Sequence, residues 1–201
     1  MARTPPGETR QRLLDEAIHL FATKGYDATS TGDIQRACGL TPGSGALYKH
    51  FPSKRALLEE AVRHNLDITA SRSREAVAAH PEGGREALHR MADVVWEVID
   101  GDRELIRIML REFDNFPELF ERMWHGVLAD VYRAGAEWIR SQNELGNTDV
   151  ADPEATAAVL LASLTYTPIL HALIGHTPGD VTPERFLAAW IDHALGTLRP
   201  P

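Results

Sequence analysis

Apolar residues recur mainly three and four positions apart along this chain, and no convincing stretch alternates apolar and polar residues with a period of two. The first spacing gathers apolar side chains on one face of an α-helix, whereas the second is typical of a β-strand. Proline stands mainly between the periodic stretches, where it begins or ends helices. The pattern therefore predicts an all-α fold of about nine helices.

The boundaries of these helices follow from residues that cap or break them. Gly25 ends the first helix, and Ser30 begins the second with Asp33 as its capping-box partner. Pro81-Glu82-Gly83-Gly84 is a clear break. The predicted helices span 9–23, 30–38, a short stretch within 41–54, 53–79, 85–99, 103–111, 116–141, 153–174 and 183–198.

Charge is divided unevenly along the 201 residues, whose formal net charge is −8. Residues 1–55 hold eight Lys and Arg against five Asp and Glu, a net charge of +3, so the remaining 146 residues carry −11. Such asymmetry is expected when one part of a protein meets phosphate and the other does not. We therefore predict a DNA-binding domain at residues 1–55 and a second, acidic helical domain at residues 56–201. The aromatic residues and the last two helices of the second domain, described below with the family resemblance, predict that it binds an effector and dimerises.

The turn Gly39-Leu40-Thr41 joins two short predicted helices, an arrangement typical of helix-turn-helix DNA-binding proteins. The second helix of such a pair needs small residues near the groove, hydrogen-bonding side chains on its exposed face and apolar anchors behind. The segment offers all three: small Ser44, Gly45 and Ala46; polar Tyr48, Lys49 and His50; apolar Leu47 and Phe51. Lys54 adds a charge at the start of the following helix, and Thr31 offers a hydroxyl at the start of the preceding one.

Two motifs follow one another here: Phe21-x3-Gly25-Tyr26-x2-Thr29-Ser30-Thr31-x-Asp33-Ile34 and Gly45-Ala46-Leu47-Tyr48-x-His50-Phe51-x-Ser53-Lys54. Together they resemble the N-terminal signature of TetR-type transcriptional regulators over residues 9–62. The resemblance implies that Thr31, Tyr48, His50 and Lys54 contact the DNA backbone, that Ser44, Gly45 and Ala46 lie where bases are read, and that Leu47 and Phe51 are structural. Thr41-Pro42-Gly43-Ser44 is longer than the matching connection in the family, so base contacts cannot be transferred to it.

Aromatic, Met and His residues gather in the middle helices of the second domain. Such residues either fill a core or line an adaptable apolar cavity. The candidate ligand-binding residues are Met91, Trp96, Met109, Phe113, Trp124, Tyr166 and His171.

The last two predicted helices, 153–174 and 183–198, carry apolar residues over more than one side and need a covering partner. The resemblance points to the same arrangement, a symmetric homodimer through these two helices.

Other function classes find little support in the sequence. The nine histidines lack the spacing of metal ligands, so we predict no metal site. The sequence contains no catalytic constellation and no cofactor-binding glycine loop, so we predict that the protein is not an enzyme and binds no cofactor. The chain has no run of about 18 apolar residues, so we predict no membrane span. Its N-terminus lacks the apolar core of a secretory signal. The single cysteine, Cys38, suits a cytoplasmic protein; it is either a core residue or an exposed thiol switch.

The sequence thus predicts a ligand-responsive DNA-binding transcriptional regulator. In this hypothesis a homodimeric repressor binds a pseudo-palindromic, double-stranded operator and is released by a small, mostly apolar effector. Two alternatives stay open: a constitutive DNA-binding regulator without an effector, and a small-molecule-binding helical enzyme.

Overall fold

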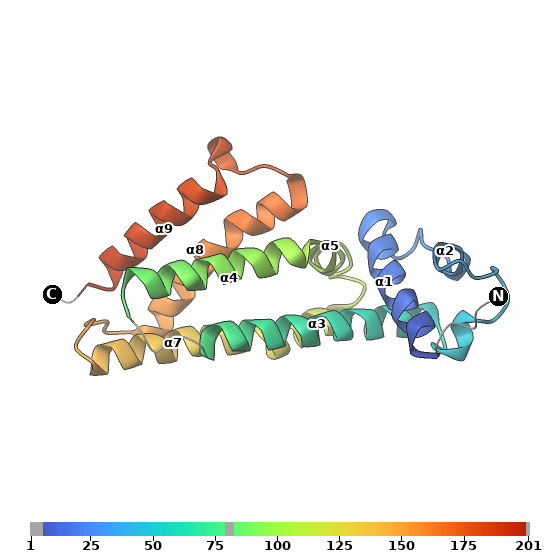
Figure 1. Ribbon diagram of the computed structural model, residues 1–201, viewed down its shortest axis with the longest axis horizontal. Coiled ribbons are helices and arrows are strands. Elements are labelled where there is room, and N and C mark those ends of the chain that lie inside the picture. The colour runs from blue at the N-terminus through green and yellow to red at the C-terminus, as the bar shows by residue number, and fades with distance from the viewer. Residues whose placement is uncertain (1–5, 79–82, 200–201) are drawn as a thin grey trace. The chain divides into compact units, whose positions relative to one another are not determined.

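The computed structural model describes residues 6–78 and 83–199, and these residues form helices and loops without a β-strand, which confirms the all-α prediction (Figure 1). Residues 1–5, Pro81 and Glu82 lie outside the described residues, so the expected break is seen only from Gly83 onward. In chain order the helices are α1 (Pro6–Lys24), α2 (Thr31–Ala37), η1 (Leu47–Lys49), α3 (Lys54–Ala78), α4 (Arg85–Gly101), α5 (Arg103–Arg111), α6 (Pro117–Met123), η2 (Trp124–Leu128), α7 (Ala129–Glu144), α8 (Pro153–Ile174), η3 (Pro178–Asp180) and α9 (Pro183–Thr197).

The long helix expected at 116–141 contains a π turn. The residues of η2 form i→i+5 hydrogen bonds, as in the bond from the Ala129 N–H to the Trp124 carbonyl oxygen. A π turn adds a residue to one helical turn, so α7 presents its side chains in a different register from α6. The spacing of apolar residues in the sequence fits a continuous α-helix and therefore does not reveal this extra residue.

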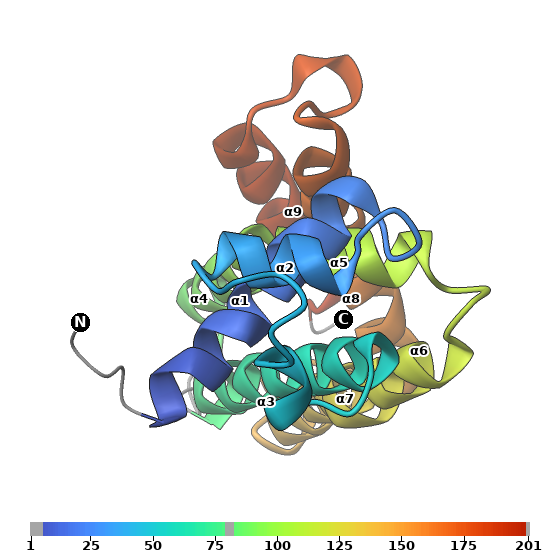
Figure 2. The ribbon, with the colours of Figure 1, turned by 90° about the vertical axis from the view of Figure 1, so that its right-hand side faces the viewer.

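The described chain divides into two compact units, which we describe separately. The first contains residues 1–67 and 104–122, and the second contains residues 68–103 and 123–201. The core of the first unit consists of the apolar faces of α1, α2 and α3, and α2 packs on α1 (Figure 2). Its fully buried side chains include Leu13, Leu14, Phe21, Ile34, Leu57 and Leu58. Burial of each such side chain contributes about 1.5–3 kcal/mol to folding.

In the second unit, α8 packs on α4, α7 and α9 (Figure 1). Gly135 allows α7 to approach α8 closely, since a Cβ atom there would lie 3.2 Å from the Leu161 Cδ1 atom. Trp190 of α9 is buried and donates its indole N–H to the Leu160 carbonyl oxygen and to the Ser163 hydroxyl oxygen, each at 3.1 Å. This hydrogen bonding satisfies the polar atom of a large core residue and fixes α9 on α8.

One face of α8 is left apolar and exposed. Among the described helices, α8 alone has the length and hydropathy that would suffice to cross a membrane, a property that core helices of soluble proteins share. Only 33% of its most apolar window is buried inside the chain. The exposed stripe follows helical spacing and contains Val159, Ala162, Ser163 and Tyr166.

Candidate nucleic-acid interface

Tyr26 contacts residues from separate parts of the first unit. Its ring contacts Phe21 of α1, with ring centroids 5.4 Å apart, and Phe116 in an edge-on arrangement at 4.8 Å. Its backbone N–H donates to the buried Glu112 carboxylate at 3.0 Å. Gly25, with a backbone φ of 91°, ends α1 just before this contact, a left-handed conformation that glycine adopts at little cost.

The ammonium group of Lys54 lies against the same turn. Its Nζ atom donates to the carbonyl oxygens of Tyr26 at 2.9 Å and Thr29 at 3.1 Å, and it lies 4.0 Å from the centroid of the Tyr26 ring. These contacts tie the start of α3 to the link between α1 and α2. Lys54 was predicted to contact phosphate; the structure adds a supporting role to that prediction.

The helix-turn-helix arises from local capping. The Ser30 hydroxyl oxygen accepts from the Asp33 N–H at 3.1 Å while the Asp33 carboxylate accepts from the Ser30 N–H at 3.0 Å, which is the predicted capping box. The Ser30 hydroxyl also donates to the Asp33 Oδ2 atom at 2.6 Å, and this bond, with the bonds from the Ser30 N–H and from Arg36, holds the pKa of the Asp33 carboxyl well below its usual range. Gly39, at a φ of 69°, turns the chain after α2, and the Leu40 N–H closes the turn on the Gln35 carbonyl oxygen at 2.8 Å.

The expected recognition helix is shorter than its predicted stretch. Only Leu47–Lys49 forms a helix, η1, which is a single 3₁₀ turn. Gly43 and Gly45 have φ values of 77° and 71°, which an α-helix does not accommodate, so the chain before Ala46 consists of turns. The side chain of the buried Gln35 holds this lead-in by accepting from the Gly43 N–H at 3.2 Å.

The predicted DNA-binding residues are gathered on one exposed segment. Tyr48 is 55% exposed, and its hydroxyl oxygen lies 3.5 Å from that of Thr31, which joins the two ends of the helix-turn-helix. Ser44 and Lys49 are exposed, while Gly45, Ala46 and His50 are partly exposed. Leu47 and Phe51 are buried, as the resemblance implied for structural positions. The fold thus anchors the segment from behind and leaves its polar side chains open to a partner.

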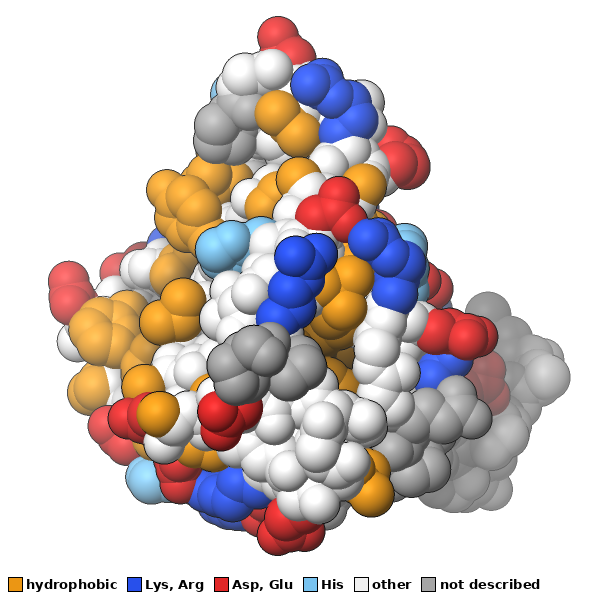
Figure 3. Space-filling view, turned by 90° about the vertical axis from the view of Figure 1, so that its left-hand side faces the viewer, with side chains coloured by type: hydrophobic (Ala, Val, Ile, Leu, Met, Phe, Trp, Pro, Cys, Tyr) orange, Lys and Arg blue, Asp and Glu red, His pale blue; other side chains and the backbone are white. Residues whose placement is uncertain are grey.

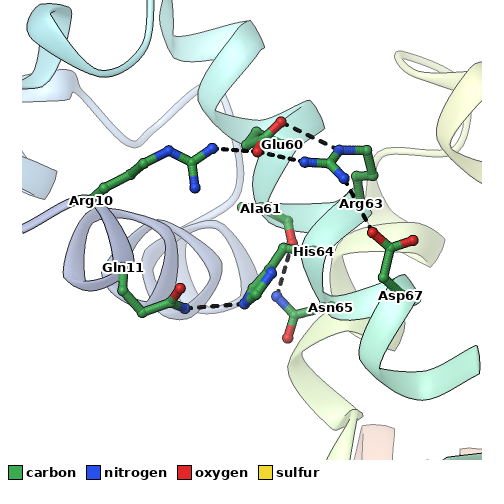
Figure 4. Close-up of polar contacts among 8 residues, drawn as sticks. All are labelled: Arg10, Gln11, Glu60, Ala61, Arg63, His64, Asn65 and Asp67. Carbon is green, nitrogen blue, oxygen red and sulfur yellow. Dashed lines mark hydrogen bonds and ion pairs between the residues drawn. The ribbon is translucent and has the colours of Figure 1, made fainter. Parts of the chain in front are cut away.

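Polar contacts also join α1 to α3 within this unit (Figure 4). Glu60 of α3 pairs with Arg10 of α1 and with Arg63, whose Nη2 atom lies 2.6 Å from the Glu60 Oε1 atom. The hydrogen bond from Arg63 is the main cause of a lowered pKa at Glu60. On the same helices, the Nε2 atoms of Gln11 and His64 lie 3.2 Å apart. These contacts hold α1 and α3 in a fixed register.

Sequence reasoning missed the segment 104–122 as part of this unit. Glu112 is 5% exposed, accepts from Tyr26 and from the Asn115 side-chain amide, and therefore occupies a satisfied polar site in the core. Arg55 pairs with Glu118, and its guanidinium lies 4.9 Å from the centroid of the Phe116 ring. The sequence signalled here only a short amphipathic helix at 103–111, followed by a stretch in which Phe113 and Phe116 alternate with polar residues.

The candidate ligand-binding residues fall in both units. In the second unit, Trp96 lies beside His171, with ring centroids 6.2 Å apart, and beside Phe186 at 6.0 Å. Met91 packs against the core cluster, whereas Trp124 and Tyr166 are 43% and 62% exposed. In the first unit, Met109 is buried and Phe113 is 46% exposed. The structure thus places Trp96 beside His171; the ligand contacts of all seven residues stay a prediction.

Cys38 is buried, and burial raises the pKa of its thiol to about 11. The thiolate fraction at pH 8 is then about 10⁻³, and the thiolate is the reactive form. We expect Cys38 in the folded protein to react with a disulfide reagent such as DTNB at least about tenfold more slowly than in the unfolded chain. Equal rates in native buffer and in guanidinium chloride would instead support the exposed thiol switch.

Two short helices on a buried three-helix scaffold, with an exposed polar segment at their tip, define a helix-turn-helix DNA-binding domain. Residues 13–61 match the family described as bacterial regulatory proteins, tetR family, and residues 74–197 match the family described as AefR-like transcriptional repressor, C-terminal domain. The chain belongs to the tetR family and is a DNA-binding transcriptional regulator. This family consists of regulators rather than enzymes, and the described residues hold no group of three or more His, Cys, Asp or Glu side chains placed to bind a metal ion.

Individual relatives agree with this family. The HTH-type transcriptional repressor KstR2 of Rhodococcus jostii is 35% identical over 139 residues, which are 63% of this chain and 67% of that protein. The biofilm operon negative transcriptional regulator IcaR of Staphylococcus aureus is 26% identical over 61% of this chain and 62% of its own length. A TetR-family regulator from Mesorhizobium loti has the same fold, with a TM-score of 0.72 at 23% identity over 98% of this chain and all of that chain.

Proposed function

We propose that this regulator is a cytoplasmic, dimeric repressor that binds a pseudo-palindromic operator and is released by a small, mostly apolar effector. The observation that carries the proposal is the exposed polar segment of residues 41–50 on a rigidly supported helix-turn-helix unit. The printed names of KstR2 and IcaR, a repressor and a negative regulator, favour repression. The proposal is tested by identifying the operator through selection of bound genomic fragments and then measuring its affinity by fluorescence anisotropy titration.

We propose that the two subunits meet through α8 and α9. The exposed stripe of α8 is matched on α9 by exposed small residues at helical spacing, Ala188, Ala189 and Gly196. Small side chains permit close approach of helices, and burying an apolar face of this kind needs a partner. A two-fold axis through these helices gives two identical reading units, which suits an operator with two half-sites about 34–36 Å apart.

The proposed DNA contacts are those of the exposed segment and of the two supporting helices. Tyr48, Lys49 and His50 bind backbone phosphates or base edges, with Thr31 and Lys54 on the flanking phosphates. Ser44, Gly45 and Ala46 face the groove, where their small size lets the backbone approach. Phosphate contacts of this kind determine affinity and its salt dependence, whereas contacts to base edges determine sequence preference.

Release by an effector needs a ligand with different affinities for the DNA-bound and free arrangements. Trp96 and His171, which lie beside each other in the second unit, are the best supported contacts for an apolar ligand with one polar group. Since α3, α5 and α6 each contribute residues to both units, they are elements through which binding in one unit can affect the other. A constitutive regulator without an effector would show operator binding that no small molecule changes.

Tyr48→Ala is expected to weaken operator binding by about tenfold, because it removes a hydrogen-bonding group and an aromatic contact at the exposed tip. Its effect on stability is expected to stay within about 0.5 kcal/mol, since the side chain is largely exposed. Fluorescence anisotropy and thermal unfolding give the two values. Lys24→Ala, which removes an exposed charge elsewhere in the same unit, is the control. Equal losses in both variants would show that only general charge or surface effects are measured.

A further inference from the structure

A cavity of about 420 Å³ lies at one end of the second unit, where α4 begins and where α7 and α9 end. The space-filling view of this end shows a hollow with apolar side chains inside and with both basic (Lys or Arg) and acidic (Asp or Glu) side chains around it (Figure 3). Its volume is within the range of roughly 300–1,000 Å³ that small-molecule sites occupy. None of the seven candidate effector residues lines it, so it requires its own explanation.

The lining of this cavity contains an unsatisfied hydrogen-bond donor. Gln142, at the end of α7, is 1% exposed, and its Oε1 atom accepts from the Asn147 Nδ2 atom at 2.9 Å. The Gln142 Nε2 atom has no hydrogen-bond partner among the described residues. A buried amide without a partner lowers stability, and such groups are rare in folded proteins. Gln142 is one of the residues that line the cavity, so a rotation of its side chain presents this donor to an acceptor that enters the cavity.

The surrounding backbone holds Gln142 in position. A Cβ atom at Gly83 would overlap the Gln142 Oε1 atom and lie 3.1 Å from its Cδ atom, so a larger residue at this position would displace the Gln142 side chain. The loop after α7 is tied down by Asn143, whose Nδ2 atom donates to the Val150 carbonyl oxygen at 2.8 Å and whose Oδ1 atom accepts from the Val150 N–H at 3.0 Å. The donor thus belongs to a preformed site rather than to a loose surface.

The other walls are apolar and continuous with the core. Leu88 and Leu198 are buried members of the main cluster of this unit, and Trp138 and Leu195 pack against that cluster. Such walls favour an apolar ligand body, and the indole of Trp138 favours an aromatic one.

The charge around the cavity favours an anion. Arg199 is the charged residue among the described lining residues, and it is exposed to solvent. Gly84, which precedes the 17-residue helix α4, has no side chain to cap the first N–H groups of that helix. A helix N-terminus and a guanidinium both stabilise a carboxylate. With the Gln142 amide, three different groups therefore favour a negatively charged acceptor.

We propose that this cavity binds a small amphipathic carboxylate. The carboxylate accepts from the Gln142 Nε2 atom and is stabilised by Arg199 and the start of α4, while the apolar body lies against Trp138 and the leucines. The site is separate from the operator-binding unit and is measured without DNA. Its failure would leave the proposed regulatory function untouched.

Three probes with one phenyl-butyl body test the proposal: 4-phenylbutyrate, 4-phenylbutan-1-ol and 4-phenylbutylamine. In isothermal titration of the full-length protein, the carboxylate is expected to bind about tenfold more tightly than the alcohol. The amine is expected to bind most weakly, because its charge is repelled by Arg199. Equal affinities for all three probes, or no carboxylate binding at millimolar concentration, would overturn the proposal.

Matched variants locate the binding. Gln142→Met keeps the length of the side chain and removes the amide, so carboxylate affinity is expected to fall about tenfold. Arg199→Gln is expected to reduce it about threefold at low salt and to leave the alcohol unaffected. Leu145→Ala, an exposed change on the same loop but outside the cavity, is the control and is expected to change nothing.

A measurement on the unmodified protein covers the case in which Gln142→Met does not fold. In a ¹H–¹⁵N spectrum, the side-chain amide of Gln142 and the indole N–H of Trp138 are expected to shift on addition of 4-phenylbutyrate. Shifts confined to other residues would overturn the proposed position. Unchanged affinity in a folded Gln142→Met variant would mean that the amide is satisfied by trapped water and has no role in binding.

Discussion

Replacing Val159 by arginine is expected to split the regulator into monomers and to lower its affinity for a two-half-site operator by about 100-fold. Val159 is 62% exposed on the apolar stripe of α8. In a two-fold interface each substitution occurs twice, so two like charges would be buried close to the axis without partners. Loss of the dimer removes the gain in affinity that comes from binding two half-sites at once.

Sedimentation velocity at micromolar concentration measures the first effect, and anisotropy titration with a labelled operator measures the second. The folded monomer is expected to keep its thermal stability within about 0.5 kcal/mol apart from the contribution of dimerisation, because Val159 makes little contact within its own chain. Glu97→Arg, which changes charge on the exposed part of α4, is the control and is expected to remain dimeric. A Val159→Arg protein that stays dimeric would remove α8 from the proposed interface.

Lys54→Met is expected to reduce both the stability of the first unit and its affinity for DNA. The ammonium group is hydrogen-bonded to two carbonyl oxygens and lies over the Tyr26 ring. Its loss is expected to lower the free energy of unfolding by about 1.5–3 kcal/mol, the range for hydrogen bonds to charged groups. If the same group also neutralises a phosphate, the slope of log K against log salt falls by about one unit.

These two effects of Lys54 are measured separately. Urea unfolding gives the change in stability, and operator titrations between 50 and 200 mM salt give the slope, at a temperature well below the unfolding transition. Arg36→Met, which removes an exposed charge of the same unit whose ion pair among the described residues is with Asp33, is a matched control. If the salt slope of operator binding is unchanged while the free energy of unfolding falls, Lys54 supports the fold and does not contact a phosphate.

Local signals in the sequence predicted the helices well. The capping box of Ser30 and Asp33 forms as expected, and the helices expected at 103–111 and 153–174 have those bounds in the structure. Periodicity and capping are properties of neighbouring residues, so a sequence contains them directly. The motif around Tyr48 also marked a segment whose polar side chains the structure exposes; their DNA contacts stay a prediction.

Features that depend on tertiary contacts could not be predicted from these local signals. The attachment of 104–122 to the first unit rests on Glu112 and Phe116 meeting Tyr26 across about ninety positions of sequence. The short η1 depends on two glycines whose left-handed conformations the sequence permits but does not impose. The π turn of η2 and the unsatisfied amide of Gln142 likewise become visible only in three dimensions.

The dependence of Tyr26 on Glu112 and Phe116 has a consequence for chimeric regulators. A recombinant fusion that takes only residues 1–67 from this chain would lack Glu112 and Phe116. The Tyr26 ring and its backbone N–H would then depend on contacts from the recipient protein. Exchange of operator specificity between relatives is therefore expected to succeed when 104–122 is transplanted together with residues 1–67. The 36 residues between these two stretches, 68–103, belong to the second unit, so the two parts of the first unit must be moved together although they are not contiguous in sequence.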